Sequence, residues 1–490
     1  MANKNKFIIL PFDKWLGLIL LLNISLKLLW FFQVAIVQGL HGDELSYFNI
    51  AASLHNSSNL YDILISLFSH QHRMPGTTIL IFFSQSISDS LSFMRFVFMS
   101  FETFLFVTSC IVVCRIFGKI ITRIFAGFIA VSPMMISFSF NVWGDFIAGW
   151  FIFLTALFAY QAIVDNGVKQ NYLKYIFIGV LWGGSLYFRP SMIVFGPLLY
   201  IGILFLKINS LSFEKIKYSL ILISFITLGF AISWGPWMTG ASFFRQELTY
   251  QPGQNVKQEK WLKWNIWAHS PADSGWGYRR GERYDHDLAI MTMQHGNNKE
   301  KALKRMYEKV KQNSTPATLI SAISRNISNV MGNENQFLAG TMNTVGIENE
   351  PSVWFPKIKR SDTMGGYRLD SNYSPASEKA KLVILFNSYW YYTVLFLSVL
   401  WLFSVLLSIS SIGTFSIFFM ANVVCVMSMS LYHPGHGRYV FSMLPMWVLG
   451  ASFFGNVLIE KLKCVPRKFF RSGMLIFFYS IFLIFWMFKP

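Results

Sequence analysis

Hydrophobic residues along this chain fall in long runs that are separated by short polar segments. Several runs reach the roughly 20 apolar residues that an α-helix needs to cross a bilayer. The pattern predicts an all-α polytopic membrane protein with about 11 transmembrane helices plus interfacial helices. The expected spans are about residues 12–37, 93–114, 121–138, 146–164, 175–188, 192–206, 218–237, 382–407, 412–431, 440–458 and 474–488.

Two stretches depart from this pattern. The run 74–87 is short, begins with Pro75-Gly76 and is broken by polar residues, so we expect it to lie at the membrane interface or to re-enter. The segment 238–381 is largely polar and long enough for a small domain of mixed or helical structure, with an amphipathic helix near residues 299–311. The predicted division is a transmembrane module at 1–237 with its first external loop at 39–92, an extracytoplasmic segment at 238–381 and a C-terminal transmembrane module at 382–490.

Composition agrees with a membrane protein and limits its partners. Of 490 residues, 53% are hydrophobic and only 13% are charged, which does not suit a soluble domain. The net charge of +18 comes from Lys and Arg that fall mostly between the apolar runs, as the positive-inside rule expects, so it does not indicate nucleic-acid binding. This distribution predicts a cytoplasmic N-terminus, and it places residues 238–381 and the loop 433–439 outside. None of the four cysteines lies in the polar segment, so no disulfide framework is expected there.

The most informative polar stretch is Asp43-Glu44, which directly follows the first apolar run. Ionisable side chains are costly in hydrocarbon, so at the mouth of a span they are usually solvated or functional. The next apolar positions have helical spacing: Tyr47, Ile50, Ala51 and Leu54. This spacing predicts a short amphipathic helix on the membrane surface. Two interpretations stay open here: the carboxylates cap that helix, or they take part in chemistry.

The predicted topology brings further polar residues to the same membrane face. They are Arg73, Asp145, Arg189, His269 and Arg438. Arginine binds phosphate bidentately, and a carboxylate can accept a proton from a hydroxyl nucleophile. The set therefore suits a substrate that carries phosphate. Seen one at a time, each arginine could simply snorkel to the interface, and Asp145 could cap the span that follows it.

A series of motifs resembles the GT-C membrane glycosyltransferases, most closely the branch that contains protein O-mannosyltransferases and the lipid A aminoarabinose transferase. The stretch Asp43-Glu44-x-x-Tyr47-x-x-Ile50-Ala51-x-x-Leu54 looks like their first external loop, and Arg73-Met74-Pro75-Gly76 like the basic-Pro segment that ends it. Pro133 followed by Asp145 is similar to the second external acidic site, Leu186-Tyr187-Phe188-Arg189-Pro190 to the basic turn after it, and Arg438-Tyr439 to the late Arg-Tyr motif. The resemblance covers the transmembrane scaffold, most strongly residues 40–200, and not the polar segment.

The resemblance implies a transferase that moves a sugar from a polyprenyl-phosphate carrier to an extracytoplasmic acceptor with inversion. The residues it implies are, for catalysis, Asp43, Glu44 and Asp145 and, for the donor phosphate, Arg73, Arg189, Arg438 and Tyr439. In this scheme Asp43 is the general base, and the other two carboxylates position the acceptor or a cation. Related enzymes can carry a Glu as metal ligand where this chain has His72. The resemblance therefore allows a divalent cation without requiring one, and His72 and His269 are its candidate ligands.

Abundant Lys, Asn, Ile and Phe suggest an AT-rich bacterial gene of a surface-polysaccharide locus. Together with the resemblance, this predicts a multi-pass protein of the bacterial inner membrane that acts on a surface polysaccharide, lipopolysaccharide, glycolipid or protein. Two rivals stay open. An O-antigen ligase or polymerase would not need the Asp43-Glu44 helix. A lipid or solute transporter would place charges near the bilayer midplane and show repeats, whereas this chain is expected to carry its charges at span mouths and shows no repeat.

Overall fold

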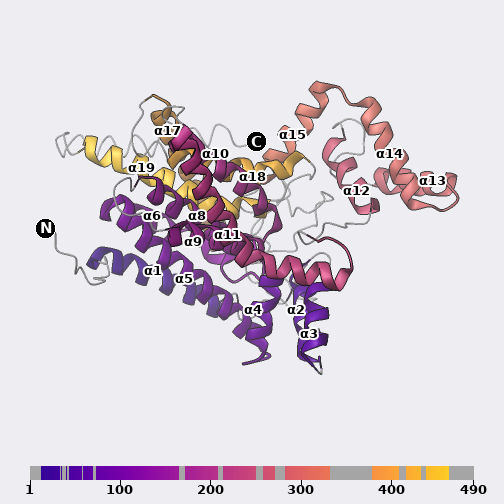
Figure 1. The fold of residues 1–490 in the computed structure, drawn as a ribbon, viewed down its shortest axis with the longest axis horizontal. Coiled ribbons are helices and arrows are strands. Elements are labelled where there is room, and N and C mark those ends of the chain that lie inside the picture. Colours follow the sequence, from indigo (N-terminus) through magenta and orange to yellow (C-terminus); the bar gives the residue numbers. More distant parts are fainter. Residues whose placement is uncertain are drawn as a thin grey trace.

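The computed structural model describes residues 13–33, 35, 40, 43–57, 59–69, 73–164, 172–207, 213–249, 258–270, 282–331, 378–407, 415–431 and 437–462. Every regular element in these ranges is a helix, as the apolar pattern predicts (Figure 1). The helices form a bundle of mostly apolar helices and a polar lobe beside it.

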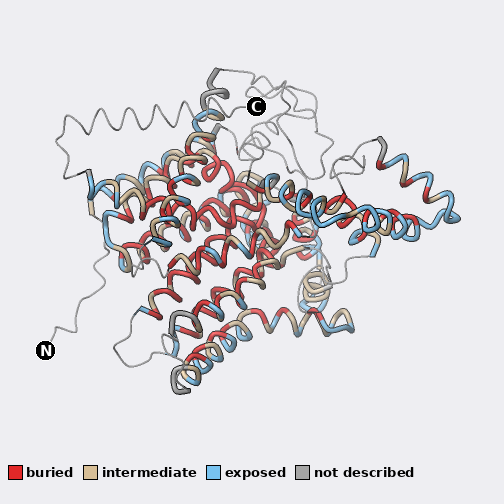
Figure 2. Tube along the Cα trace, turned by 90° about the horizontal axis from the view of Figure 1, so that it is seen from above, coloured by how far each residue is buried: buried red, intermediate tan, exposed pale blue. Residues whose placement is uncertain are grey.

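The bundle buries most of its central helix, α8 (Asp145–Val164). Its helices are α1 (Lys14–Gln33), α5 (Leu91–Phe117), α6 (Lys119–Ala130), α7 (Pro133–Phe138), α8 (Asp145–Val164), α9 (Tyr172–Leu186), α10 (Phe195–Lys207), α11 (Phe213–Arg245), α17 (Glu378–Leu407), α18 (Phe415–Met427) and α19 (Leu444–Leu462). In α8, 78% of the apolar 18-residue window is buried, against 28% in α1 and 22% in α11. Buried residues gather in the middle of the bundle (Figure 2). The outer helices therefore expose apolar side chains such as Leu21 and Leu228, which suits contact with lipid.

Fewer helices than expected are long and apolar enough to cross a membrane. In the described part of the chain these are Lys14–Phe32, Leu91–Phe117, Asp145–Val164, Ile216–Arg245 and Val383–Leu407. The predicted count of about 11 spans is not confirmed, because several predicted spans form shorter apolar helices: Tyr172–Leu186, Pro190–Leu204 and Phe415–Leu431. The predicted span at 474–488 lies outside the described residues.

One predicted span, at 121–138, is divided in two. α6 ends at Ala130, and α7 begins at Pro133 after a break at Val131 and Ser132. Proline has no N–H to donate to the preceding turn and is favoured at the first position of a new helix. The Ser132 hydroxyl accepts a hydrogen bond from the Met135 amide at 3.3 Å and caps that helix. The sequence contains this stop signal.

Three shorter helices lie at one end of the bundle. They are α2 (Asp43–His55), α3 (Leu60–Ser69) and α4 (Pro75–Gln85). The predicted apolar positions of α2 form its buried face: Tyr47, Ile50, Ala51 and Leu54 are all below 8% exposed. α4 has 11 residues, fewer than the roughly 20 needed for a crossing. Its length agrees with the expected interfacial or re-entrant placement.

The polar lobe has a small core of its own. Its helices are α12 (Gln258–His269), α13 (Glu282–Gln294), α14 (Lys299–Asn313) and α15 (Pro316–Met331). Buried Trp267 and Tyr284 pack with apolar residues of α14 such as Leu303 and Met306. α14 corresponds to the predicted charged amphipathic helix, and Asn298 caps it by accepting from the Lys301 amide at 3.0 Å. This separate apolar core allows the lobe to fold although most of its sequence is polar.

The lobe is attached to the bundle through α15. The buried Asn326 amide donates to the carbonyl oxygen of Ala268 in α12 (3.1 Å) and to that of Ser430 (3.0 Å). Ser430 lies in η5 (Ser428–Leu431), which leads toward a second 3₁₀ helix, η6 (Gly437–Ser442). One side chain thus ties the lobe to the segment that carries Arg438.

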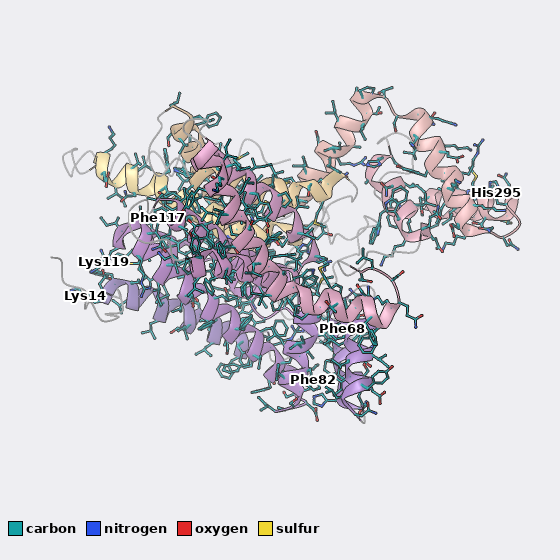
Figure 3. All side chains as sticks on the ribbon, in the orientation of Figure 1. Lys14, Phe68, Phe82, Phe117, Lys119 and His295 are labelled. Carbon is teal, nitrogen blue, oxygen red and sulfur yellow. The ribbon has the colours of Figure 1, made fainter. Side chains whose placement is uncertain are left out.

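The opposite end of the bundle is basic. Arg123 of α6 forms an ion pair with Asp13, which precedes α1. Lys14 and Lys119 lie together at this end, whereas His295 lies at the far tip of the lobe (Figure 3). The basic residues and the lobe therefore occupy opposite ends of the molecule.

Candidate functional site

Asp145 and Arg189 form an ion pair at the end of the bundle where α8 begins. Asp145 is the first residue of α8, and Arg189 is the N-cap residue of the 3₁₀ helix η2 (Pro190–Val194). Their exposed fractions are 4% and 8%, so solvent screens their attraction less than at a free surface. Two motifs that the sequence places at span mouths are thus in direct contact.

Arg438 and Tyr439 of η6 complete this cluster. The Nε atom of Arg438 lies 3.8 Å from Oδ2 of Asp145. The guanidinium of Arg189 lies 4.0 Å from the ring centroid of Tyr439, and that of Arg438 lies 5.2 Å from the ring of Trp143. One carboxylate and two aromatic rings therefore hold two guanidinium groups. We call Asp145, Arg189, Arg438 and Tyr439 the arginine cluster.

Two glycines allow the backbone segments of this cluster to approach each other. A Cβ atom on Gly144 would lie 2.4 Å from the carbonyl oxygen of Phe188, and one on Gly149 would lie 2.8 Å from that of Phe441. Both distances are too short for a real side chain. Gly144 and Phe188 each precede a member of the ion pair, so their close packing brings the two charged side chains together.

Glu44 is buried and fully engaged by its surroundings. Its Oε1 accepts from Arg95 Nη1 at 3.3 Å and from the Val142 amide at 2.8 Å, and its Oε2 accepts from Arg95 Nη2 at 3.0 Å. Arg95 also donates to the carbonyl oxygen of Phe140 at 2.9 Å. α2 begins at Asp43, whose side chain lies outside the described residues. The start of α2 is therefore fixed to the segment that precedes Asp145.

Arg73 contacts α2. Its Nε donates to the Ser46 hydroxyl at 2.9 Å, and its guanidinium lies 5.4 Å from the ring of Tyr47. Three residues later, the Gly76 amide donates to the Tyr187 carbonyl oxygen at 2.8 Å. The basic-Pro segment thus lies between α2 and the turn that carries the arginine of the ion pair.

The two candidate metal ligands differ in placement. His72 lies outside the described residues. His269 Nε2 lies 2.5 Å from the carbonyl oxygen of Leu431, where the lobe meets η5. Within the described ranges, no three His, Cys, Asp or Glu side chains come together as a group that could hold a metal ion. The prediction of a divalent cation therefore stays a prediction.

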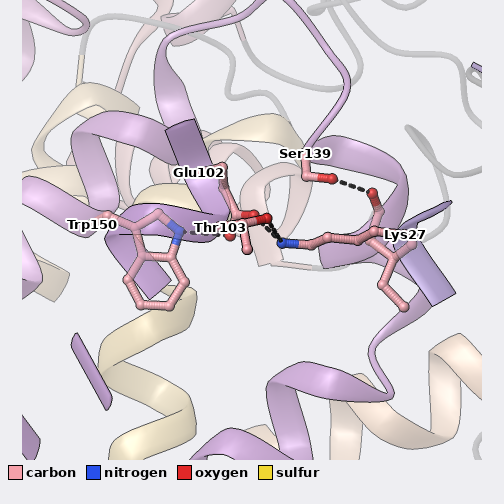
Figure 4. Close-up of polar contacts among 6 residues, drawn as sticks. Lys27, Glu102, Thr103, Ser139 and Trp150 are labelled. Carbon is pink, nitrogen blue, oxygen red and sulfur yellow. Dashed lines mark hydrogen bonds and ion pairs between the residues drawn. The ribbon is translucent and has the colours of Figure 1, made fainter. Parts of the chain in front are cut away.

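Sequence reasoning missed three buried charges inside the apolar helices: Lys27, Arg95 and Glu102. Lys27 of α1 forms an ion pair with Glu102 of α5, and Glu102 Oε1 also accepts from Trp150 Nε1 at 3.0 Å (Figure 4). Lys27 donates to the Thr103 hydroxyl at 2.9 Å as well. The expectation that charges lie only at span mouths is therefore wrong. The signal was available, because an ionisable residue in an apolar run needs a partner.

The arginine cluster is suited to binding an anion. Two guanidinium groups and one carboxylate leave a net positive charge at the start of α8. Each guanidinium has five N–H donors and stays protonated, so donors remain for an incoming phosphate after the carboxylate is satisfied. The surrounding rings lower the local polarity and strengthen such contacts. This arrangement suits an anion with several acceptor oxygens.

Comparison with known proteins finds a likeness among solved structures. No protein-family profile matches the chain, and no curated protein matches it. Among solved structures, the chain is similar to the crystal structure of the apo form of the oligosaccharyltransferase of Archaeoglobus fulgidus, with a TM-score of 0.48 and 11% identity. The likeness covers 91% of this chain and 50% of that one, so this chain spans about half the length of the archaeal enzyme.

Proposed function

We propose that this protein is an integral-membrane glycosyltransferase that moves a sugar from a polyprenyl-phosphate carrier to a hydroxyl group of an acceptor. The acceptor oxygen attacks the anomeric carbon, and the bond from that carbon to the phosphate oxygen breaks. The acceptor proton passes to Asp43, and the polyprenyl phosphate leaves. Attack opposite the leaving group inverts the anomeric carbon.

The observation that carries this proposal is the arginine cluster. A leaving phosphate gains negative charge in the transition state, and donors fixed in advance around it lower the barrier. Asp145 and two aromatic rings hold Arg189 and Arg438 in such fixed positions. We assign Arg189 and Arg438 to the donor phosphate and Asp145 to orienting them.

The remaining site residues take their roles from their place around the cluster. Asp43 begins α2 and is the proposed base. Arg73 contacts α2 and lies in the same external loop, so we assign it to the donor phosphate as well. Both carboxylate oxygens of Glu44 are occupied by Arg95 and Val142, so Glu44 acts by positioning rather than by contact with the acceptor.

The wider assignment follows the sequence. We propose an active site on the extracytoplasmic face of a bacterial inner membrane, because basic residues gather at the opposite end of the bundle. Surface polysaccharides, lipopolysaccharide and glycolipids are the acceptors that suit this location.

A transporter is the alternative, and the buried Lys27–Glu102 pair is the observation that bears on it. Charges inside transporters line a pathway. Here the two charges pair with each other, are 2% exposed, and join α1 to α5. This arrangement favours a fixed contact between helices over a pathway.

Mass spectrometry of glycans and glycolipids from matched cells tests the function. Deletion of the gene should remove one sugar residue from a surface glycan or glycolipid, and the wild-type gene should restore it. Asp145→Asn should not restore it, because an amide cannot pair ionically with the arginines. Asp89→Asn, an exposed carboxylate at the start of α5, is the matched control and should restore it. Identical spectra with and without the gene would refute a glycosyltransferase.

A further inference from the structure

Helix α5 carries two buried charges of opposite sign on one face. Arg95 and Glu102 are 0% and 2% exposed and lie about two helical turns apart. Arg95 pairs with Glu44 of α2, and Glu102 pairs with Lys27 of α1. The two ion pairs differ in their further hydrogen-bond partners, and this difference points to a role for Arg95.

The Arg95–Glu44 pair also satisfies a stretch of irregular backbone. Residues 139–144 join α7 to α8 outside any regular helix and are buried throughout. Buried backbone groups without a helical partner need another one. Arg95 donates to the Phe140 carbonyl, and Glu44 accepts from the Val142 amide. The pair thus serves as a connector between α5, α2 and this segment.

Two residues of the proposed reaction lie close to this connector in the chain. Asp43 is adjacent to Glu44, and Asp145 comes three residues after Val142. Through its contacts with Arg95 and the Val142 amide, Glu44 holds the start of α2 against the backbone of this segment. The separation between the proposed base and the arginine cluster is therefore set across this connector.

We propose that Arg95 is a positioning residue that sets Asp43 relative to Asp145, Arg189 and Arg438. This inference rests on the proposed function. A buried ion pair often adds little net stability compared with apolar side chains of similar volume. Its value here lies in orientation: the planar guanidinium binds the carboxylate with two parallel hydrogen bonds and the Phe140 carbonyl with a third.

The Lys27–Glu102 pair is the matched control within the same helix. It is similarly buried, and the residues that hydrogen-bond to it, Thr103 and Trp150, lie inside regular helices (Figure 4). Neutralising this pair removes a buried ion pair from α5 but leaves in place the hydrogen bonds of Arg95 to Phe140 and of Glu44 to Val142. It therefore separates a loss of stability from a loss of positioning.

The test is a double-mutant cycle with Glu44→Gln, Arg95→Gln and the double variant, beside Lys27→Gln/Glu102→Gln, in the full-length protein. The first readout is amide hydrogen exchange of the peptide that covers residues 139–144, which needs no substrate. The second is kcat and KM for sugar transfer per folded molecule. We expect each single variant to exchange faster in this peptide and to lose about 10²-fold in kcat, the cost of misplacing reacting groups by about 1 Å.

The double variant should be no worse than the poorer single variant, because both residues act through one contact. The Lys27→Gln/Glu102→Gln variant should melt earlier but keep both its kcat and its exchange rate in residues 139–144. If Arg95→Gln does not fold, Arg95→Lys replaces it, since an ammonium keeps the charge but loses the fork that reaches both Glu44 and Phe140.

Unchanged exchange in residues 139–144 would overturn the proposal, and so would kcat losses that multiply in the double variant, since Glu44 would then act on the substrate directly. A wild-type protein that transfers no sugar would refute the proposed function instead. In that case the exchange data still decide whether Arg95 holds the segment.

Discussion

The guanidinium of Arg189 lies over the ring of Tyr439, 4.0 Å from its centroid. The two residues come from distant parts of the chain, and their contact joins the turn after α9 to η6. Because Tyr439 is 4% exposed, the ring fixes the arginine without competing for its N–H donors. A positively charged group held in this way is ready to bind an anion before the anion arrives.

Arg438→Lys should weaken the binding of a polyprenyl phosphate by about 10-fold to 100-fold, the cost of one charge-assisted hydrogen bond. Lysine keeps the charge but loses the bidentate geometry. Binding is measured by the rise in melting temperature with added lipid. Arg305→Lys is the control, because Arg305 forms an exposed ion pair on α14 and should leave binding unchanged. Equal binding by the Arg438 variant would make this arginine an interfacial anchor.

Asp43→Asn should lower sugar transfer by about 10²-fold to 10⁴-fold, the range for loss of a general base. Asparagine caps a helix about as well as aspartate, so the melting temperature should stay close to that of the wild type. A residue that only caps α2 would tolerate the change. Wild-type transfer rates in this variant would therefore remove Asp43 from the mechanism.

Asp13 gives a pH dependence at the other end of the bundle. Hydrogen bonds from Arg123 hold the pKa of its carboxyl at about 2, below the ordinary 3.8. A lowered pKa means that the contact contributes stability above about pH 4 and loses it as the pH falls toward 2. The difference in melting temperature between the wild type and Asp13→Asn should be equal at pH 5 and pH 7 and smaller at pH 3. A difference that grows as the pH falls would contradict this sign.

Labelling of single cysteines tests the orientation of the chain. On a background without the four native cysteines, His295→Cys at the tip of the lobe should react with an impermeant maleimide in cells with a permeable outer membrane. Lys119→Cys, at the basic end, should react only after lysis, because basic loops stay in the cytoplasm. Reaction of Lys119→Cys alone in unlysed cells would invert the topology and remove the site from the outer face.

Local patterns in the sequence predicted an all-helical protein and the positions of several helices. The spacing of Tyr47, Ile50, Ala51 and Leu54 predicted both α2 and its buried face. Charged α14 and the short α4 were also predicted. The division at Ser132-Pro133 was missed, although proline marks it. These features depend on neighbours within a few residues, so a sequence pattern can carry them.

The pairing of distant side chains was decided only by the tertiary structure. The sequence grouped Asp145, Arg189 and Arg438 on one face, but their contact depends on how Gly144 and Gly149 let separate backbones approach. It also could not indicate that Glu44 would be occupied by Arg95, because this pair forms only when α2 and α5 pack. Apolar periodicity determines that a helix forms and which face it buries, whereas the partner of a buried charge depends on the packing of helices that are far apart in the chain.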